Sequence, residues 1–336
     1  MNELITIREV ESNEEIAEFW RERDEYMIRD VFPNDTLGEP LTQNDLDWFL
    51  SKEYKDHMME IFYRDEDKAH FVFFEENGER IGFCSYVTYF SEDNKCFIID
   101  YCIRPGFRRQ GYGKACFRAL KERETKKGAD YSELNISNEG NRSFWASLGF
   151  EYNGFDEYGS ILYQLKPAQC GEITYEVFQI KDFDQLKQLM GGYKKAIREK
   201  LLTDAQKTSL KNAIENHEIF FFVAKRKTRL IGMCSISLTF STYQCKKSGV
   251  FEDFYILPVY QNSGIATSLT NFAFHWCDKH DVTSLWVGSS KGDIDMYQHL
   301  GFGVQLGSLL AWSADKKVGI PIRLNSHSHI SNQEYK

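Results

Sequence analysis

The sequence predicts a mixed α/β fold that occurs twice in tandem along a chain of 336 residues. Three observations support this prediction. Segments of the first half recur in the second half at a nearly constant offset, and strand-like and helix-like segments alternate in both halves. Each half also has a glycine-containing stretch between a strand and a helix. Two domains of ordinary size match this chain length.

The repeat is visible in three pairs of segments. Residues 80–90 (RIGFCSYVTYF) correspond to residues 230–240 (LIGMCSISLTF) at an offset of 150. Two further pairs follow at offsets of 153 and 152, namely 101–113 with 254–266, and 143–150 with 295–302. Three collinear matches at a near-constant shift indicate a duplicated domain.

The domain boundary is expected where Pro167 and Gly171 separate two strand-like runs. We therefore predict an N-terminal domain over residues 1–166 and a C-terminal domain over 172–314. Residues 315–336 read as a polar tail. Its His327 and His329 could bind a metal ion, but a solvated chain end is the simpler interpretation, and we predict no metal site.

The same order of elements is expected in both halves. A short strand (residues 5–10 and 173–178) precedes acidic, amphipathic helical stretches. A pair of strands follows, which in the first half turns at Asn77-Gly78, a strong hairpin signal. The corresponding pair in the second half turns through the basic run 225–229. A central strand, the glycine loop, a helix, another strand, a short helix and a final strand complete each mixed sheet.

Composition and charge limit the class of protein. Hydrophobic residues make up 42% and aromatic residues 15% of the chain, which is enough for two cores. The formal net charge of −9 argues against nucleic acid or an anionic membrane as a partner. Because the sequence has neither a membrane-span pattern nor an apolar signal segment, we expect a cytoplasmic protein.

The eight cysteines are scattered and form no C-x-x-C pair. Most lie inside apolar runs. This pattern indicates reduced, buried thiols rather than disulfides or metal ligands.

The glycine stretch of the first half suggests an anion site. Gly111 and Gly113 stand where a strand passes into a helix, and glycine lets backbone amides approach a ligand closely. The first turn of a helix has unpaired amides and the positive end of the helix dipole. Arg108, Arg109 and Lys114 add positive charge, so a pyrophosphate would fit. The spacing matches neither a Walker loop nor a dinucleotide motif. The alternative is a tight turn with solvated arginines.

Two motifs carry a family resemblance. The pattern [R/Q]-x-x-G-x-[G/A] occurs at 108–113 and at 261–266, in both cases just after a proline, Pro105 or Pro258. A second pattern, N-x-x-A-x-x-[F/Y]-Y-x-x-x-G-F, is matched in part by residues 138–150 and 290–302. Both patterns, in this order, resemble the GNAT superfamily of acyl-CoA-dependent N-acyltransferases. The resemblance covers nearly the whole chain, twice.

The resemblance implies two GNAT-like domains that use acetyl-CoA as a co-substrate. Each glycine loop would hold the pyrophosphate of coenzyme A, and the preceding strand would offer amides to the pantetheine arm and the oxyanion. The coenzyme-binding residues expected in the first half are Ile103, Arg108, Arg109, Gln110, Gly111, Tyr112, Gly113, Lys114 and Asn138. Those expected in the second half are Ile256, Gln261, Asn262, Ser263, Gly264, Ile265, Ala266 and Thr267.

The catalytic candidates are two carboxylates and a phenol. Asp100 and Asp253 both lie five residues before the proline, and each could take a proton from the attacking amine. Tyr297 matches the position of the family's general acid, which in the first half is occupied by Trp145. We interpret the second half as slightly better equipped for turnover. Glu133 is a secondary base candidate.

We therefore predict an acetyl-CoA-dependent N-acetyltransferase that moves an acyl group to a primary amine of a small molecule by direct attack. The alternative is an acyl-CoA-binding or sensor protein without turnover. The acidic charge disfavours a third class, which transfers amino acids from tRNA. The sequence leaves open the identity of the amine, which domain is active, whether both bind coenzyme A, and whether the chain forms a homodimer.

Overall fold

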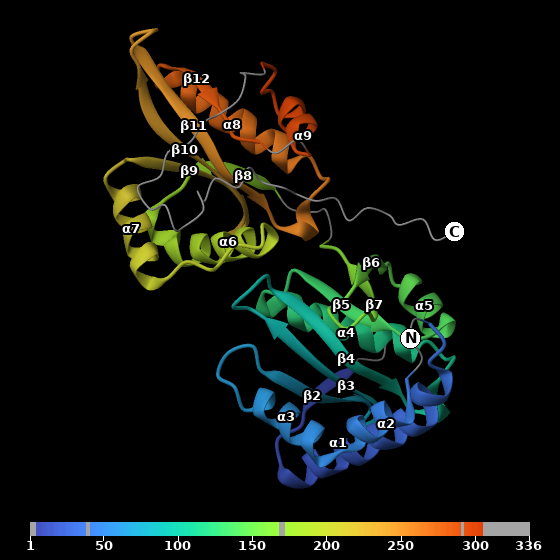
Figure 1. Cartoon of the computed structure of the whole chain (residues 1–336). Coiled ribbons are helices and arrows are strands. Elements are labelled where there is room, and N and C mark those ends of the chain that lie inside the picture. Colours follow the sequence, from blue (N-terminus) through green and yellow to red (C-terminus); the bar gives the residue numbers. More distant parts are fainter. Residues whose placement is uncertain (1–4, 38–40, 168–171, 290–291, 305–336) are drawn as a thin grey trace. The chain divides into compact units, whose positions relative to one another are not determined.

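The computed structural model describes residues 5–37, 41–167, 172–289 and 292–304. The chain forms two compact units, Met1–Ala168 and Gln169–Lys336, and each contains a mixed sheet flanked by helices (Figure 1). The predicted fold class is thus confirmed. The predicted tail, with His327 and His329, lies outside the described residues. Among the described helices, none is both long and apolar enough to cross a membrane.

The N-terminal domain has a seven-stranded sheet in the order β1-β2-β3-β4-β5-β7-β6. Its strands are β1 (Thr6–Glu9), β2 (Ala69–Glu76), β3 (Glu79–Tyr89), β4 (Lys95–Ile103), β5 (Tyr131–Ile136), β6 (Glu151–Phe155) and β7 (Ile161–Leu165). Its α-helices are α1 (Asn13–Tyr26), α2 (Gln43–Leu50), α3 (Lys52–Phe62), α4 (Tyr112–Lys127) and α5 (Glu139–Ala146). Three short helices are η1 (Met27–Val31, a π-helix), η2 (Phe32–Asn34) and η3 (Pro105–Phe107).

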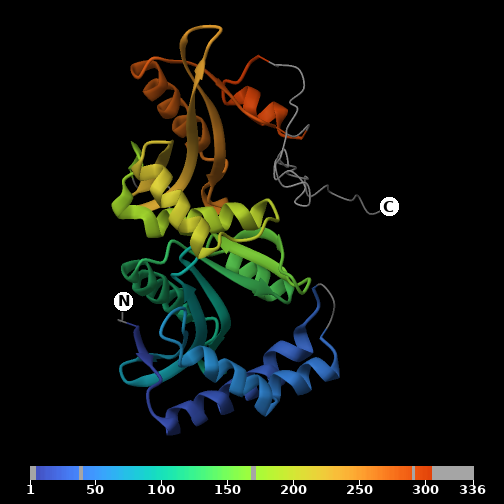
Figure 2. The same ribbon diagram turned by 60° about the vertical axis from the view of Figure 1, so that its left-hand side comes forward.

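Helices cover both faces of this sheet (Figures 1 and 2). Phe71 and Phe73 of β2 pack with α1 and α3, whereas Val72 and Phe74 pack in the cluster that contains α4 and α5. Because successive side chains of a strand point to opposite faces, both sets are buried. This explains why β2 reads as a continuous apolar run rather than an alternating one.

The C-terminal domain has a five-stranded sheet among its described residues, in the order β12-β11-β10-β9-β8. Its strands are β8 (Ile173–Val177), β9 (Ile219–Arg226), β10 (Arg229–Ser241), β11 (Lys246–Ile256) and β12 (Val282–Trp286). Its helices are η4 (Ile180–Asp182), α6 (Phe183–Ala196), α7 (Asp204–Glu215), η5 (Pro258–Tyr260), α8 (Ile265–Lys279) and α9 (Ile294–His299). The final strand expected from the sequence would lie outside the described residues.

The hairpin turn of the first half has the predicted form. Asn77 and Gly78 have φ angles of 51° and 82°, so both central residues are left-handed. Two such residues make the turn whose twist matches the flanking strands. In the second half the turn falls at Lys227, whose φ is 54°, within the basic run.

The glycine of the repeated Ile-Gly pair lies where two neighbouring strands come close together. Gly82 of β3 lies opposite Ile103 of β4, and Gly232 of β10 lies opposite Ile256 of β11. A Cβ atom at Gly82 would lie 2.2 Å from the carbonyl oxygen of Cys102. Glycine is therefore required where the end of the central strand approaches its neighbour most closely.

The central strand of each domain leaves one neighbour halfway along its length. β4 pairs with β5 only from Lys95 to Ile98, and β11 pairs with β12 only from Lys247 to Val250. On the other side both strands contain a bulge, which lies opposite the step from Ser85 to Tyr86 in β3 and from Met233 to Ser235 in β10. A bulge bends its strand. Each sheet therefore opens along one edge of its central strand.

Candidate active site

The two glycine loops have the same backbone conformation. Arg109 and Asn262 have φ angles of 59° and 58°, and Gly111 and Gly264 have φ angles of 94° and 80°. Left-handed backbone is unfavourable for residues with a Cβ, and Asn and Gly tolerate it best. Two loops of different sequence thus keep one geometry, which turns the chain sharply into a helix.

The helices after these loops begin without a side-chain cap. Gly111 and Gly264 are the N-cap residues of α4 and α8, and neither helix start has a capping hydrogen bond from a side chain. Five other described helices are capped by the side chains of Ser12, Thr42, Ser51, Asn138 and Thr203. The described helices α6 and α9 also begin without a side-chain cap, but only α4 and α8 begin at a left-handed glycine. The first-turn amides of α4 and α8 are thus both uncapped and open to close approach by an anion.

The first residue of each motif supports the strand before it. The Nε atom of Arg108 donates a hydrogen bond of 2.7 Å to the carbonyl of Ile103, and Nε2 of Gln261 donates one of 3.0 Å to the carbonyl of Ile256. The guanidinium of Arg108 also pairs with Asp30. The expected contribution of Arg108 to the positive charge of the loop is thus offset by a carboxylate 78 residues earlier.

The exposed cations of the N-terminal loop are Arg109 and Lys114. No residue in the described part of the chain forms an ion pair with either of them. Gln110 is exposed and donates to the carbonyl of Gly106, while the Tyr112 hydroxyl donates to Glu76. Gly113 lies against Phe144, where a Cβ atom would come within 3.1 Å of the ring.

The C-terminal loop is less charged. Asn262, Ser263 and Thr267 are exposed, and the Ser263 hydroxyl donates to the carbonyl of Tyr260 at 2.5 Å. Ile265 is buried, with 2% of its surface exposed, so its side chain anchors the start of α8 in the core. Ala266 stands where the first half has Gly113.

At the end of each central strand, one backbone amide points away from the neighbour that still pairs with it, β3 or β10. Arg104 donates its amide to Ile81 in β3, and Leu257 donates its amide to Ile231 in β10. Because successive amides of a strand alternate in direction, those of Ile103 and Ile256 point to the opposite side. On that side the described strands no longer pair. The amides of both residues therefore point to the open side of their strands.

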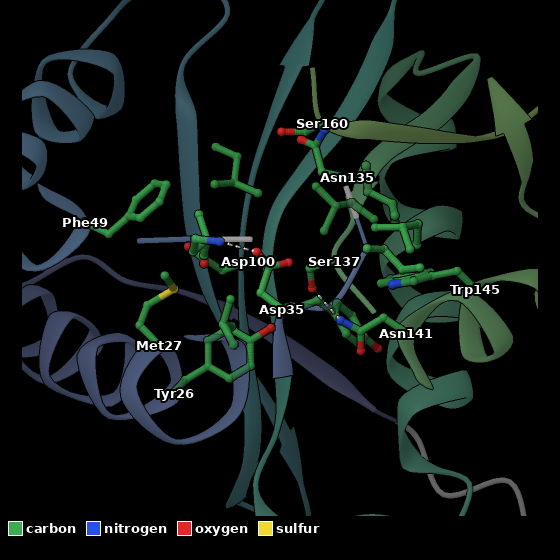
Figure 3. A pocket seen from close by; sticks show the side chains of 18 of the residues that line it. Tyr26, Met27, Asp35, Phe49, Asp100, Asn135, Ser137, Asn141, Trp145 and Ser160 are labelled. Atoms are coloured by element: carbon green, nitrogen blue, oxygen red, sulfur yellow. Dashed lines mark hydrogen bonds between the residues drawn. The ribbon is translucent and has the colours of Figure 1, made fainter. Parts of the chain in front are cut away.

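A cavity of 340 Å³ lies at the open edge of the N-terminal sheet. β4 contributes the residues from Phe97 to Tyr101, and β5 contributes the residues from Leu134 to Ile136. Figure 3 shows Tyr26 and Phe49 on one side of Asp100, and Asn141 and Trp145 on the other. The cavity thus combines polar and aromatic walls beside the strand end that carries Ile103.

Asp100, the predicted base of the first half, lines this cavity. Its Oδ2 atom accepts a hydrogen bond of 2.7 Å from the Ser85 hydroxyl and lies 3.5 Å from Nε of Arg23. Only 8% of Asp100 is exposed. No described residue donates to its other carboxylate oxygen, Oδ1, which can therefore accept a proton or an amine hydrogen bond.

Arg23 is a residue that the sequence analysis did not single out. It is 1% exposed, donates to the carbonyl of Phe49 at 2.5 Å, and lies 4.6 Å from the ring centre of Tyr54. Its Nε atom is buried without a hydrogen-bond partner among the described residues. The sequence did contain a signal for Arg23. Arg23 is a charged residue on the same helix face as Phe19 and Trp20, which is the apolar face.

Two further groups of the cavity have shifted pKa values. Burial, with the nearby Cys102, Asp100 and Asp30, raises the pKa of the Tyr26 phenol, so the phenol stays neutral. Burial likewise raises the pKa of the Asp35 carboxyl, which accepts a hydrogen bond from the amide of Leu41. The carboxylates Asp35 and Asp100 outnumber the single cation Arg23, so the described walls favour a positively charged ligand.

Asn138 and Glu133 both form hydrogen bonds within the N-terminal domain. The side-chain oxygen of Asn138 accepts the amide of Asn141 at 2.8 Å and so caps α5. Glu133 is bound by Lys95, Asn153 and Gln164, and it is not part of the cavity wall. Glu133 thus has three structural partners, and its role as a second base stays a prediction.

Asp253 occupies the bulge of β11 with a φ angle of 50°. Its Oδ2 atom accepts a hydrogen bond of 3.0 Å from the Ser235 hydroxyl. Burial raises the pKa of the Asp253 carboxyl, and the hydrogen bond from Ser235 lowers it less. Tyr297, the predicted acid, lies on α9 with 5% of its surface exposed and its ring edge-on to Phe302.

Comparisons with known proteins agree with this geometry. The family model described as Acetyltransferase (GNAT) family matches residues 40–150 and 183–302. No curated protein sequence matches the chain.

Similar solved structures each correspond to about half of the chain. A predicted acetyltransferase with acetyl-CoA from Clostridium acetobutylicum is 17% identical and covers 42% of this chain and 96% of its own, with a TM-score of 0.38. An aminoglycoside acetyltransferase from an uncultured soil metagenomic sample, in complex with sisomicin, is 15% identical and covers 43% and 97%, with a TM-score of 0.39. Glucosamine-6-phosphate N-acetyltransferase from Arabidopsis thaliana is 14% identical and covers 43% and 99%, with a TM-score of 0.36.

Proposed function

Because the chain belongs to the GNAT acetyltransferase family, matched once in each domain, we propose that it is an acetyl-CoA-dependent N-acetyltransferase. The proposed acceptor is a primary amine of a small molecule, which attacks the acyl group directly. The observation that carries this proposal is the position of the cavity. The open edge of β4, the start of α4 and the carboxylate of Asp100 lie next to one another.

The described residues fit coenzyme A. A Cβ atom added at Gly111 or Gly264 would meet no atom within 4 Å, so open space lies over each loop. The first-turn amides of α4 and α8 would bind the pyrophosphate. In the N-terminal domain Arg109 and Lys114 add positive charge. In the C-terminal domain the backbone amides would provide most of the binding.

The strand edge would hold the acyl end of the coenzyme. The thioester of acetyl-CoA supplies the carbonyl that is attacked and a thiolate that leaves. The amide of Ile103, or of Ile256 in the other domain, would donate to the carbonyl oxygen as negative charge develops on it. The carbonyl groups of these two residues are already bound by Arg108 and Gln261, which restrains the strand end that carries the amides.

The cavity would receive the amine. An aliphatic amine is protonated near neutral pH, since its pKa is about 10. Asp35 and Asp100 attract this cation, and Oδ1 of Asp100 can accept one of its protons. Tyr26 and Trp145 offer aromatic faces to the same cation.

The C-terminal domain repeats the base and adds an acid. Ser235 binds Asp253 as Ser85 binds Asp100. Burial raises the pKa of the Asp253 carboxyl, which strengthens it as a proton acceptor. Tyr297 could protonate the leaving thiolate. We therefore propose that turnover depends mainly on Asp253 and Tyr297.

A second candidate function for the N-terminal domain is binding of acyl-CoA without turnover. The ion pair between Arg23 and Asp100 favours it, because the guanidinium already pairs with the carboxylate that would bind the amine. Trp145 in place of a tyrosine also favours it, because an indole cannot protonate a thiolate usefully.

The test is release of free thiol from acetyl-CoA in the presence of a panel of small primary amines. We expect turnover with at least one small primary amine, and binding of acetyl-CoA by calorimetry. Tight binding without thiol release for any amine would support the second candidate for both domains. Absence of binding even at millimolar acetyl-CoA would contradict both candidates.

A further inference from the structure

Arg108 joins two parts of the N-terminal domain that are far apart in sequence. Its Nη1 and Nη2 atoms donate to Oδ1 and Oδ2 of Asp30 at 2.9 and 2.6 Å. Arg29 donates to the same carboxylate at 2.7 Å. Paired, parallel bonds between a guanidinium and a carboxylate are strong and fix the geometry of both groups.

The third nitrogen of the same guanidinium reaches the coenzyme side. Nε of Arg108 donates to the carbonyl of Ile103 at 2.7 Å. Asp30 belongs to the π-helix η1, whose residues Met27 and Val31 line the cavity. One planar group therefore contacts both the wall of the proposed acceptor site and the strand end of the proposed coenzyme site.

We propose that Asp30 is a positioning residue, which acts through Arg108 to couple the acceptor wall at η1 to the coenzyme-binding strand end and loop. This inference rests on the proposed function. Asp30 does not line the cavity. It holds Arg108 against the carbonyl of Ile103, and so restrains the strand end whose amide at Ile103 would face the acyl oxygen.

The C-terminal domain provides a natural comparison. Gln261 makes the strand bond at 3.0 Å but has no charge to offer a carboxylate. The substitution Arg108→Gln would therefore keep the support of the strand and remove the link to Asp30. Arg108→Ala would remove both, so the two variants separate the two contacts.

Turnover and coenzyme binding should respond differently. In Asp30→Asn the first-turn amides, Arg109 and Lys114 remain, so we expect coenzyme affinity within about twofold of the parent chain. A misplaced strand end should lower kcat by about 10- to 100-fold in turnover assigned to this domain. Asp30→Glu, which keeps the carboxylate, should recover part of the loss.

Hydrogen exchange measures the coupling without turnover. We would compare the full chain with and without coenzyme A and follow the amides of 103–114 and 27–31. In the parent chain both segments should exchange more slowly with coenzyme A. In Asp30→Asn and Arg108→Gln the slowing should persist at 103–114 and be lost at 27–31. Asp56→Asn removes a carboxylate from an exposed ion pair and should behave like the parent chain.

The outcomes are separable. If the parent chain shows slower exchange at 103–114 but not at 27–31, the coupling is wrong and the coenzyme site stands. If coenzyme A still slows exchange at 27–31 in both variants, Asp30 does not carry the coupling. If neither segment responds in the parent chain, both the coupling and the proposed coenzyme site of this domain are wrong.

Discussion

The hydroxyl group of Ser235 donates a hydrogen bond of 3.0 Å to Oδ2 of Asp253. The first half has the same relationship, in which Ser85 donates to Asp100 at 2.7 Å. The surroundings of the two carboxylates differ. Arg23, the eleventh residue of α1, lies beside Asp100, whereas the eleventh residue of α6 is Tyr193. Duplication has thus preserved the geometry of this pair while its electrostatics have diverged.

This difference predicts unequal effects of removing the two carboxylates. Asp253→Asn should lower thiol release by about 100- to 10,000-fold, the usual contribution of a general base. Asp100→Asn should mainly weaken binding of the acceptor amine in the N-terminal cavity. The neighbouring exposed carboxylate offers a matched control, Glu252→Gln, which should leave the rate unchanged. Activity that survives Asp253→Asn but not Asp100→Asn would assign catalysis to the N-terminal domain.

The raised pKa of Asp253 predicts the pH profile. Only the deprotonated carboxylate can accept a proton, so kcat/KM should rise with pH through a pKa above the ordinary value of 3.8. The same shift has a sign for stability. Since the folded state holds this proton more tightly than the unfolded state, stability falls as pH rises through that range. Asp253→Asn should remove both effects, and an unchanged acidic limb would show that another group is the base.

The two glycine loops can be tested separately by calorimetry with acetyl-CoA. Gly111→Ala and Gly264→Ala place a Cβ on left-handed backbone, which costs about 1–2 kcal/mol per residue. Because space around both positions is open, the change acts through the loop conformation. Each should weaken one of two binding events. Gly106→Ala, in the same region but without a left-handed φ, is the control. Two intact binding events in both variants would contradict the assignment of the two glycine loops as pyrophosphate sites.

The backbone of the site was predictable from local sequence, whereas its electrostatics were not. Glycine and proline spacing predicted the loop and the helix start, because these depend on residues close together in the chain. The open strand edge was expected only from the family resemblance, since it depends on pairing between β4 and the more distant β5. Asp30 and Arg108 are 78 residues apart, and Arg23 meets Asp100 only after α1 packs on the sheet.

The buried pair predicts a large effect on stability. Arg23→Met leaves Asp100 without its cation at a site where Arg23 is only 1% exposed. Removal of one partner of a buried ion pair costs about 3–5 kcal/mol. The double variant Arg23→Met, Asp100→Asn should recover most of this loss, because no uncompensated charge remains. Urea unfolding followed by tryptophan fluorescence measures both. Equal stability of the parent and Arg23→Met would mean that the pair is energetically neutral.

Tyr297 gives the final prediction, since its phenol is the group proposed to protonate the leaving thiolate. Tyr297→Phe keeps the buried ring against Phe302, so the fold and coenzyme affinity should persist. Because a thiol of pKa about 8.5 leaves without much help, the loss in kcat should be near the low end for a general acid, about 100-fold. Tyr243→Phe makes the same chemical change at a residue that is 96% exposed and should have no effect. A rate for Tyr297→Phe equal to that of Tyr243→Phe would reduce Tyr297 to a core residue, and the thiolate would then leave unassisted.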